Sequence, residues 1–274
     1  MKHTILLTLL SLALLAGCKK ENAQKPPTQD PPVDVRTIFL KDMIVKNLPS
    51  PYYHFDYDDS SFITHVNFQS GLALYDLSYA NGRISQMNNN TSVNKDKLQY
   101  EYENGMVSKI KYTNKEGVFF KQTNLTYNSS KQLISAEWHL VNADESLTPE
   151  RKIQLEYYAD GNLSKVNDHW FEIENRQPEL NYVDTYENYD TKFNVDAFAI
   201  LHKIDDHLFL LPNIVLQKNN PIKETHTGDG LNYSIAYSYT YTDSLPIKKD
   251  GDMVFLNGSN AGMHNNYLIT FSYY

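Results

Sequence analysis

Three aspartates in the segment FDYDDSS, Asp56, Asp58 and Asp59, offer the carboxylate oxygens that calcium takes as ligands. The segment lacks the turn glycine and the distal glutamate of an EF-hand loop, so a solvated acidic turn is the favoured interpretation. His202 and His207 are five residues apart on a predicted helix, a spacing that does not place two metal ligands on one face. We therefore predict no metal site.

Sequence motifs for common catalytic chemistries are missing. The chain contains no Gly-x-Ser-x-Gly elbow, no phosphate-binding loop and no metalloprotease helix. Paired carboxylates for glycoside hydrolysis need no motif, and the 33 Asp and Glu leave that chemistry open. We predict a non-enzymatic protein without a cofactor, with a hydrolase as the lesser alternative.

The single cysteine, Cys18, closes the run LAGC (15–18) behind a basic start and a short apolar stretch. This order of segments is typical of a secretory signal, and the run resembles the lipobox of bacterial lipoproteins. The resemblance implies cleavage before Cys18 and a lipid on its thiol, so residues 1–17 are predicted to be a signal peptide. Each buried lipid methylene contributes about 0.8 kcal/mol, so several acyl chains would hold the protein on a membrane. An ordinary secretory signal followed by a chance cysteine is the alternative.

Residues 18–36 are predicted to be a lipidated and disordered tether, and residues 37–274 a single β domain. The tether contains four prolines and almost no apolar side chains, so it buries too little surface to fold. Extended structure would give it a reach on the order of 50 Å. Lys19, directly after the cysteine, favours the outer membrane over the inner membrane, with the periplasmic or surface face undetermined.

The composition indicates which classes of molecule this protein could bind. The formal charge is −8, and it becomes −9 when Lys2 leaves with the signal peptide. An acidic body is a poor match for nucleic acid, which attracts clusters of Lys and Arg. The 21 tyrosines suit half-buried strands, and they also suit a binding surface for a glycan, a peptide or an envelope protein.

A degenerate repeat runs through the body. Its clearest copies are LSYANGRISQM (77–87), YEYENGMVSKI (100–110), LTYNSSKQLISAEW (125–138), LEYYADGNLSKV (155–166) and YSYTYTDSLPIKK (237–249). The anchor tyrosines are Tyr57, Tyr79, Tyr102, Tyr127 and Tyr157. Each copy alternates apolar and polar residues and several contain Asn-Gly or Asp-Gly, which predicts a β-hairpin. The fold is therefore predicted to be mainly β, an antiparallel meander of hairpins that closes into a barrel or a strongly curved sheet.

Two resemblances concern this fold. The repeats resemble the YD repeats of Rhs-type proteins. The tail from 209 to 249, with its Leu-Pro-Asn, Asn-Pro, Tyr-x-Tyr-x-Tyr and Pro-x-Lys elements, is similar to Bacteroides-group lipoproteins of unknown function. That second resemblance implies a porin-like β-barrel fold, and it indicates no particular activity. Most strands look five to eight residues long and the last strand is only half apolar, which favours a water-soluble barrel with its apolar face inward over a membrane pore.

One segment, 194–211, is predicted to be a short amphipathic helix. Phe198, Leu201 and Leu208 recur at helical spacing, with Ile204 or Asp205 between them, Asn194 at the start and Pro212 after the end. We expect it to pack on the sheet or over a barrel mouth. A helix on the membrane surface is the alternative.

Four aromatic residues are predicted ligand contacts: Trp138, Trp170, Tyr157 and Tyr158. Core packing is the alternative for each. The leading hypothesis is an outer-membrane lipoprotein that binds a glycan, peptide or partner protein. A structural lipoprotein without a small ligand and a hydrolase are the competing hypotheses.

Overall fold

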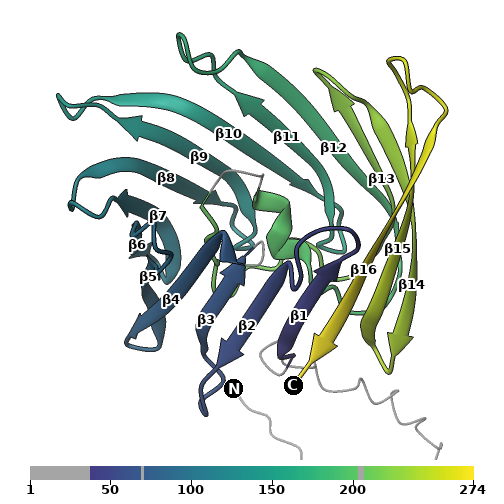
Figure 1. Ribbon diagram of the computed structural model, residues 1–274, viewed down its shortest axis with the longest axis horizontal. Helices are drawn as coiled ribbons and strands as arrows, with labels where there is room; N and C mark the ends of the chain where they lie inside the picture. Colours follow the sequence, from purple (N-terminus) through teal and green to yellow (C-terminus); the bar gives the residue numbers. More distant parts are fainter. Residues whose placement is uncertain (1–37, 69–70, 203–206) are drawn as a thin grey trace, which may run out of the picture. The chain divides into compact units, whose positions relative to one another are not determined.

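The computed structural model describes residues 38–274 apart from 69–70 and 203–206. The predicted signal peptide, Cys18 and the tether lie outside the described residues. The described chain forms sixteen antiparallel strands, each paired with its sequence neighbours, and β1 pairs with β16 to close a barrel (Figure 1). The strands are β1 (Leu40–Val45), β2 (Tyr53–Tyr57), β3 (Ile63–Phe68), β4 (Ala73–Ala80), β5 (Arg83–Asn89), β6 (Lys97–Glu103), β7 (Met106–Thr113), β8 (Phe119–Tyr127), β9 (Leu133–Val141), β10 (Leu147–Tyr157), β11 (Leu163–Trp170), β12 (Leu180–Tyr189), β13 (Pro221–Gly228), β14 (Tyr233–Thr242), β15 (Leu245–Phe255) and β16 (His264–Tyr273). The predicted meander is confirmed, and of the two predicted forms, a barrel and a strongly curved sheet, the structure has the closed barrel.

The two faces of the wall differ in polarity. In β4, Ala73, Tyr75 and Leu77 are buried and point into the barrel, while the residues between them point outward. The outward positions of neighbouring strands carry ion pairs such as Glu101–Lys111 and Glu137–Lys152, at 2.6 and 2.7 Å. A membrane-spanning barrel instead presents an outward apolar band. The apolar face is therefore inward, as predicted.

The lengths of the strands do not distinguish this barrel from a membrane-spanning one. Strands β10 and β15 reach eleven residues, longer than the five to eight expected of most strands. Turn signals mark where a hairpin reverses but do not limit how far paired strands extend. Only the polarity of the outer face separates this barrel from one with an outward apolar band. Among the described residues, no helix is long and apolar enough to cross a bilayer.

The repeat tyrosines form a ring of hydrogen bonds at one end of the barrel. Each even-numbered strand carries, at or near its end, a tyrosine whose hydroxyl donates to a backbone carbonyl at the start of the preceding strand. The pairs of this tyrosine ring are Tyr57–Leu40, Tyr79–Ile63, Tyr102–Ile84, Tyr127–Val107, Tyr157–Leu133, Tyr189–Leu163, Tyr239–Pro221 and Tyr273–Pro246, at 2.5 to 3.0 Å. All five predicted anchor tyrosines belong to the ring. Each of these five follows a register shift in its strand pair, so a bulge sets the position of the tyrosine.

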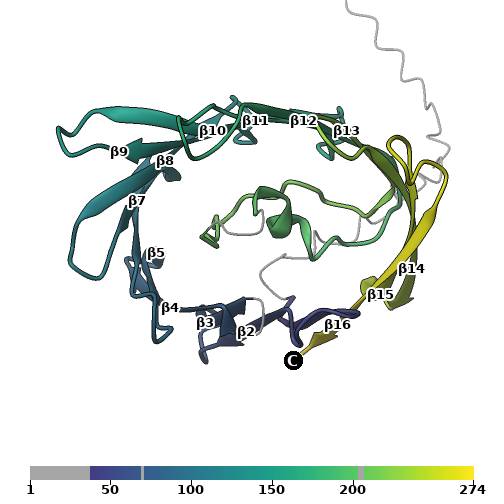
Figure 2. The ribbon, with the colours of Figure 1, turned by 45° about the horizontal axis from the view of Figure 1, so that its top comes forward.

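The described parts of the segment between β12 and β13, residues 190–202 and 207–220, run inside the ring of strands (Figure 2). We call this segment the insert. Its only helical element among the described residues is the 3-10 helix η3 (Ala197–Leu201). A short helix around 194–211 was predicted, and η3 forms over part of that range; Ile204 and Asp205 lie outside the described residues. Asn194 does begin the turn, because its side-chain oxygen accepts the N–H groups of Asp196 and Ala197 at 3.1 and 2.8 Å.

The interior of the barrel explains why the helix is short. Leu208, Phe209 and Leu210 are consecutive and all buried, a pattern that no one-sided helix provides. A segment enclosed by an apolar wall buries side chains in every direction, and each fully buried Leu or Phe contributes about 1.5–3 kcal/mol. The apolar residues do recur at helical spacing in the sequence. Because the barrel wall encloses the insert, however, the segment does not need a polar face towards solvent.

Polar contacts attach the insert to several strands of the wall. They are Asp196–Lys249 at 2.8 Å, His207–Asp96 at 2.7 Å, the Leu210 N–H donating to Tyr100 Oη at 3.1 Å, and the Arg151 guanidinium donating to the Leu201 carbonyl at 3.4 Å. Lys249 lies on β15, Arg151 on β10 and Tyr100 on β6, and Asp96 directly precedes β6, so contacts far apart around the barrel hold the insert across the interior.

Candidate functional site

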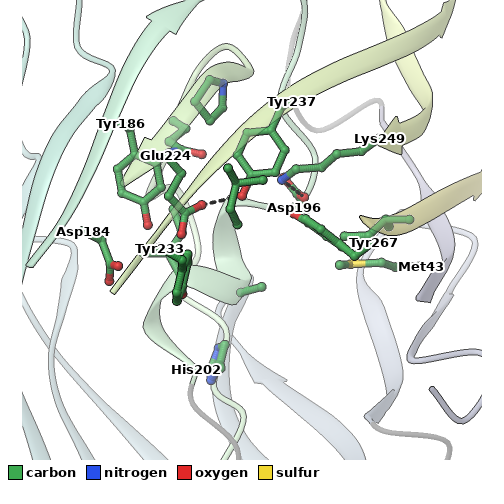
Figure 3. A pocket seen from close by; sticks show the side chains of 16 residues that line it. Met43, Asp184, Tyr186, Asp196, His202, Glu224, Tyr233, Tyr237, Lys249 and Tyr267 are labelled. Carbon is green, nitrogen blue, oxygen red and sulfur yellow. Dashed lines mark hydrogen bonds and ion pairs between the residues drawn. The ribbon is translucent and has the colours of Figure 1, made fainter. Parts of the chain in front are cut away.

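A cavity of about 270 Å³ lies between the insert and the wall formed by β12 to β16 (Figure 3). The wall contributes tyrosines and charged groups, and the insert contributes a carboxylate, an imidazole and an amide. The labelled residues of its lining are Met43, Asp184, Tyr186, Asp196, His202, Glu224, Tyr233, Tyr237, Lys249 and Tyr267. This is the candidate functional site.

Strand register brings the wall residues together. Asp184 pairs with His226, which pairs with Tyr233, so these three form one row across β12, β13 and β14. Two residues further along β12, Tyr186 pairs with Glu224 in the next row. Side chains two residues apart share a face, so both rows point into the barrel. Alternation and register together create the polar lining.

The first row ends in stacked aromatic rings. The His226 ring stacks on Tyr182 and on Tyr233, with centroids 5.2 and 4.7 Å apart. Asp184 lies 2.5 Å from the His226 Nδ1 and orients the imidazole. The result is an aromatic strip of three rings on the concave inner face of the barrel, continuous with the cavity through Tyr233 and Asp184.

An ion pair occupies the opposite part of the cavity. The Lys249 Nζ lies 2.8 Å from the Asp196 carboxylate, and both side chains are about nine-tenths buried. The ammonium also lies 4.6 Å from the centre of the Tyr237 ring. Burial is the largest single influence and acts to lower the pKa of Lys249, but the charge and hydrogen bond of Asp196 together with the nearby Tyr267 and Tyr239 raise the pKa well above its usual value. Lys249 is therefore charged at neutral pH.

Glu224 lies between Tyr186 and Tyr237 (Figure 3) and accepts a hydrogen bond from the Tyr237 hydroxyl at 2.5 Å. Burial raises the pKa of Tyr186, Tyr233 and Tyr237, and the negative charge of Glu224 raises each of them further. All three tyrosines therefore stay neutral at neutral pH.

Gly251 shapes the cavity by lacking a side chain. It faces inward between Tyr237 and Tyr267, its partners on the neighbouring strands. A Cβ at this position would lie 2.2 Å from the Tyr267 ring. The glycine thus lets that ring lie against the sheet instead of filling the cavity.

The two predicted tryptophan contacts surround an arginine. Trp138 is fully buried, and its ring centroid lies 6.0 Å from that of Phe209. The Arg151 guanidinium lies over Trp138 and Trp170, at 4.8 and 4.7 Å from the ring centres. It also donates to both Asp168 carboxylate oxygens, at 2.9 and 3.0 Å. This geometry is that of a packed ion pair between two rings.

The two predicted tyrosine contacts lie at the wall. Tyr157 belongs to the tyrosine ring. Tyr158 is 44% exposed and donates to the Tyr186 carbonyl at 3.0 Å. Neither of them lines the cavity, and neither do Trp138 and Trp170. Their role as ligand contacts stays a prediction.

The other predicted positions have structural roles in the described chain. Asp58 forms the turn between β2 and β3, where its side chain accepts the N–H groups of Ser60 and Phe62, both at 2.9 Å. His207 contacts Asp96, and the His202 ring lies 5.2 Å from the Phe209 ring.

The sequence interpretation missed the residues of the cavity. Asp184, Glu224 and Lys249 occupy positions that the alternation of their strands assigns to the apolar face. Charged residues at inward strand positions could have indicated the cavity. Recognising them from the sequence would have required the exact boundaries of the strands.

Comparisons with known proteins bear on the fold. No protein-family model matches the chain, and no curated protein matches it. This chain shares the barrel fold of two porin-like proteins. One, from Bacteroides uniformis ATCC 8492, has a TM-score of 0.55 and 10% identity over 81% of this chain and 89% of that chain. The other, from Bacteroides vulgatus ATCC 8482, has a TM-score of 0.54 and 13% identity over 86% and 99%. At such identities the likeness shows the fold alone, and it confirms the expected porin-like barrel.

Proposed function

We propose that this chain is a non-enzymatic, lipid-anchored protein of the outer membrane whose barrel binds a small hydroxyl-bearing ligand, such as a glycan fragment, in the cavity between the insert and β12 to β16. The observation that carries the proposal is the lining. Buried polar groups cost free energy unless they are hydrogen-bonded, and this cavity brings the carboxylates of Asp184, Asp196 and Glu224 and the ammonium of Lys249 together with tyrosine side chains.

The aromatic strip supplies one ring to the cavity. The His226 ring is buried and stacked between Tyr182 and Tyr233, and Tyr233 is the member of the strip that lines the cavity. Ligand sites combine apolar and aromatic walls with a few polar groups that fix orientation, and sugars have both an apolar face and hydroxyls. The strip and the cavity together match that chemistry.

The geometry favours binding over the assembly alternative. A structural lipoprotein would need a filled interior and a bare sheet edge for its partner. Pairing of β1 with β16 leaves no free edge in the described barrel, and the interior retains a cavity. A pore is disfavoured because the insert occupies the interior and the outer face is polar (Figure 2).

The envelope location is supported by the sequence run that ends at Cys18 and by the shared fold with porin-like proteins from Bacteroides. Replacing Cys18 with serine tests the anchor. We expect Cys18→Ser to move the protein from membrane fractions to the soluble fraction, or to leave residues 1–17 attached. Unchanged fractionation and unchanged mass would refute lipidation.

Ligand binding is tested by saturation-transfer NMR on a panel of monosaccharides and short oligosaccharides. We expect Tyr233→Ala to weaken binding at least tenfold, because it removes the ring shared by the strip and the cavity. Tyr158→Ala is the control, since Tyr158 lies outside the cavity. If only the Tyr158 variant lost binding, the ligand site would lie at Tyr158, as the sequence predicted, and not in the cavity. Release of free sugar from an oligosaccharide during the experiment would favour the hydrolase.

A further inference from the structure

A second hollow, of about 430 Å³, lies at the end of the barrel that carries the tyrosine ring. β1 pairs with β16 on one side and with β2 on the other, so the start of β1 and the ends of β2 and β16 lie together at this end. These places and the turn after β2 supply the lining: Phe39, Asp56, Tyr57, Asp58, Ser61 and Tyr274. We call this hollow the seam pocket. None of its residues lines the cavity inside the barrel.

Three aromatic rings form one side of the seam pocket. The Tyr57 ring meets the rings of Phe39 and Tyr274 edge to face, with centroids 5.1 and 5.9 Å apart. The Tyr274 N–H donates to the Phe39 carbonyl at 3.1 Å, and the Tyr57 hydroxyl donates to the Leu40 carbonyl at 3.0 Å. The hydrogen bonds that close the barrel therefore also hold these rings in place.

Two carboxylates contribute the polar side of the pocket. Asp58 accepts two N–H groups of its own turn with Oδ1, both at 2.9 Å, and its Oδ2 has no hydrogen-bond or ion-pair partner among the described residues. Asp56 uses Oδ1 for the His54 ring at 3.2 Å and for the Tyr274 hydroxyl at 3.1 Å. The described lining contains no lysine, arginine or histidine. A hydrogen-bond donor that enters the pocket would meet carboxylate oxygen that the turn leaves available.

Tyrosine rings at this end of the barrel already carry cations of the chain itself. The Lys41 Nζ lies 5.0 Å from the centre of the Tyr274 ring, and the Arg83 guanidinium lies 5.4 Å from the centre of the Tyr102 ring. The face of an aromatic ring attracts a cation within about 6 Å of its centre. Both pairs indicate the ligand chemistry that such rings accept, and neither Lys41 nor Arg83 lines the seam pocket.

We infer that the seam pocket is a second binding site, for an organic cation that carries an ammonium group on an aliphatic stem. The charged group lies beside Asp58 and Asp56, and the stem packs along the three rings. The volume is within the range of about 300–1,000 Å³ that small-molecule pockets have. A free amine and a lysine side chain of another polypeptide share this chemistry. The site is independent of the sugar cavity proposed above.

The test compares ligands of the same size and different charge. The full-length protein is titrated with n-butylammonium and with n-butanol, and the amide signals of Ser61 and Tyr274 are followed by NMR. We expect n-butylammonium to bind at least tenfold more tightly, with a preference that falls as salt is added. Equal affinity for the two ligands, or no saturable shift with n-butylammonium, would overturn the inference.

The peptide Gly-Gly-Lys-Gly-Gly separates the two sources of the cation. Tighter binding of the peptide than of n-butylammonium would support a polypeptide ligand, whereas equal or weaker binding would support a free amine. Calcium chloride is the third titrant, because the carboxylates of this turn are also of the type that calcium takes. Saturable binding of calcium that displaces n-butylammonium would identify a metal site and overturn the inference.

Variants assign the binding to the pocket. Asp58→Asn removes the charge but keeps an amide oxygen for the N–H groups of the turn, and we expect it to weaken n-butylammonium at least fivefold. Tyr274→Ala removes an exposed ring and should also weaken binding. Asp59→Asn is the matched control, because Asp59 is the next residue and does not line the pocket, so its affinity should stay within twofold. An equal loss in Asp59→Asn and Asp58→Asn would show attraction to an acidic surface only and would overturn the inference.

Discussion

Removing one hydroxyl from the tyrosine ring tests the structural meaning of the repeat. The Tyr127 hydroxyl donates to the Val107 carbonyl at 2.9 Å, and Tyr127 is half-buried. A protein hydrogen bond contributes about 0.5–1.5 kcal/mol net, and its loss leaves the carbonyl without its partner. We expect Tyr127→Phe to lower the free energy of unfolding by about 1 kcal/mol, which lowers the Tm of a domain of this size by about 2–4 °C.

The ring also predicts additivity. Tyr57 on β2 and Tyr157 on β10 are eight strands apart in the closed barrel, so they share no partner. Distant substitutions add to within about 0.5 kcal/mol, so the double variant Tyr57→Phe with Tyr157→Phe should lose about 2 kcal/mol. Eight such losses would approach the whole stability of a typical domain, about 5–15 kcal/mol. We therefore expect the variant with phenylalanine at all eight ring positions not to fold.

Urea unfolding followed by far-UV circular dichroism measures these differences. Tyr274→Phe is the control, because Tyr274 is 61% exposed and its hydroxyl contacts only an exposed carboxylate, that of Asp56, among the hydrogen bonds described. It should change stability by less than about 0.5 kcal/mol. If Tyr127→Phe were as stable as the wild type, or if Tyr274→Phe lost as much, the hydrogen bonds of the ring would not be what the repeat provides.

Three further predictions concern the interior. Lys249→Met should destabilise the protein by about 3–5 kcal/mol in urea unfolding, because it leaves the Asp196 carboxylate buried without its ammonium; a loss under 1 kcal/mol would contradict the pairing. Alkaline unfolding should begin above pH 10. Burial raises the pKa of Tyr79 to about 12, so the folded state keeps a proton that the unfolded chain releases near pH 10. The stability that this group contributes below pH 10 is therefore lost as the pH rises towards 12. A stability profile that is flat from pH 9 to 12 would refute this. Gly251→Ala should push the Tyr267 ring into the cavity and weaken sugar binding while the circular dichroism spectrum stays unchanged, and unaltered affinity would show that the ring has room elsewhere.

The repeat was readable from the sequence because its determinants are local. Alternation at Tyr100 and Tyr102 and the Asn-Gly pair that follows, Asn104 and Gly105, specify a hairpin within a dozen residues. Both turn residues have positive φ in the structure, 50° and 84°, as such a turn requires. Successive hairpins with an apolar face then have one simple way to bury it, by pairing side by side.

The insert was misread because its environment is not local. Spacing at Phe198 and Leu201 predicts a helix, and η3 forms there. Beyond it, Leu208 and Phe209 are buried by strands more than fifty residues away in the chain, such as the one that carries Trp138. No pattern within the segment could indicate that all sides of it would be enclosed.

The amino-acid sequence alone determined the hairpin unit, the inward direction of its apolar face and the positions of the anchor tyrosines, because each follows from neighbours within one or two turns of chain. Only the tertiary structure decided that the meander closes between β1 and β16 and that the insert lies inside it. It also decided that Asp196 and Lys249, more than fifty residues apart, meet at one cavity. Closure and burial depend on the sum of many strand pairings, which no single segment encodes.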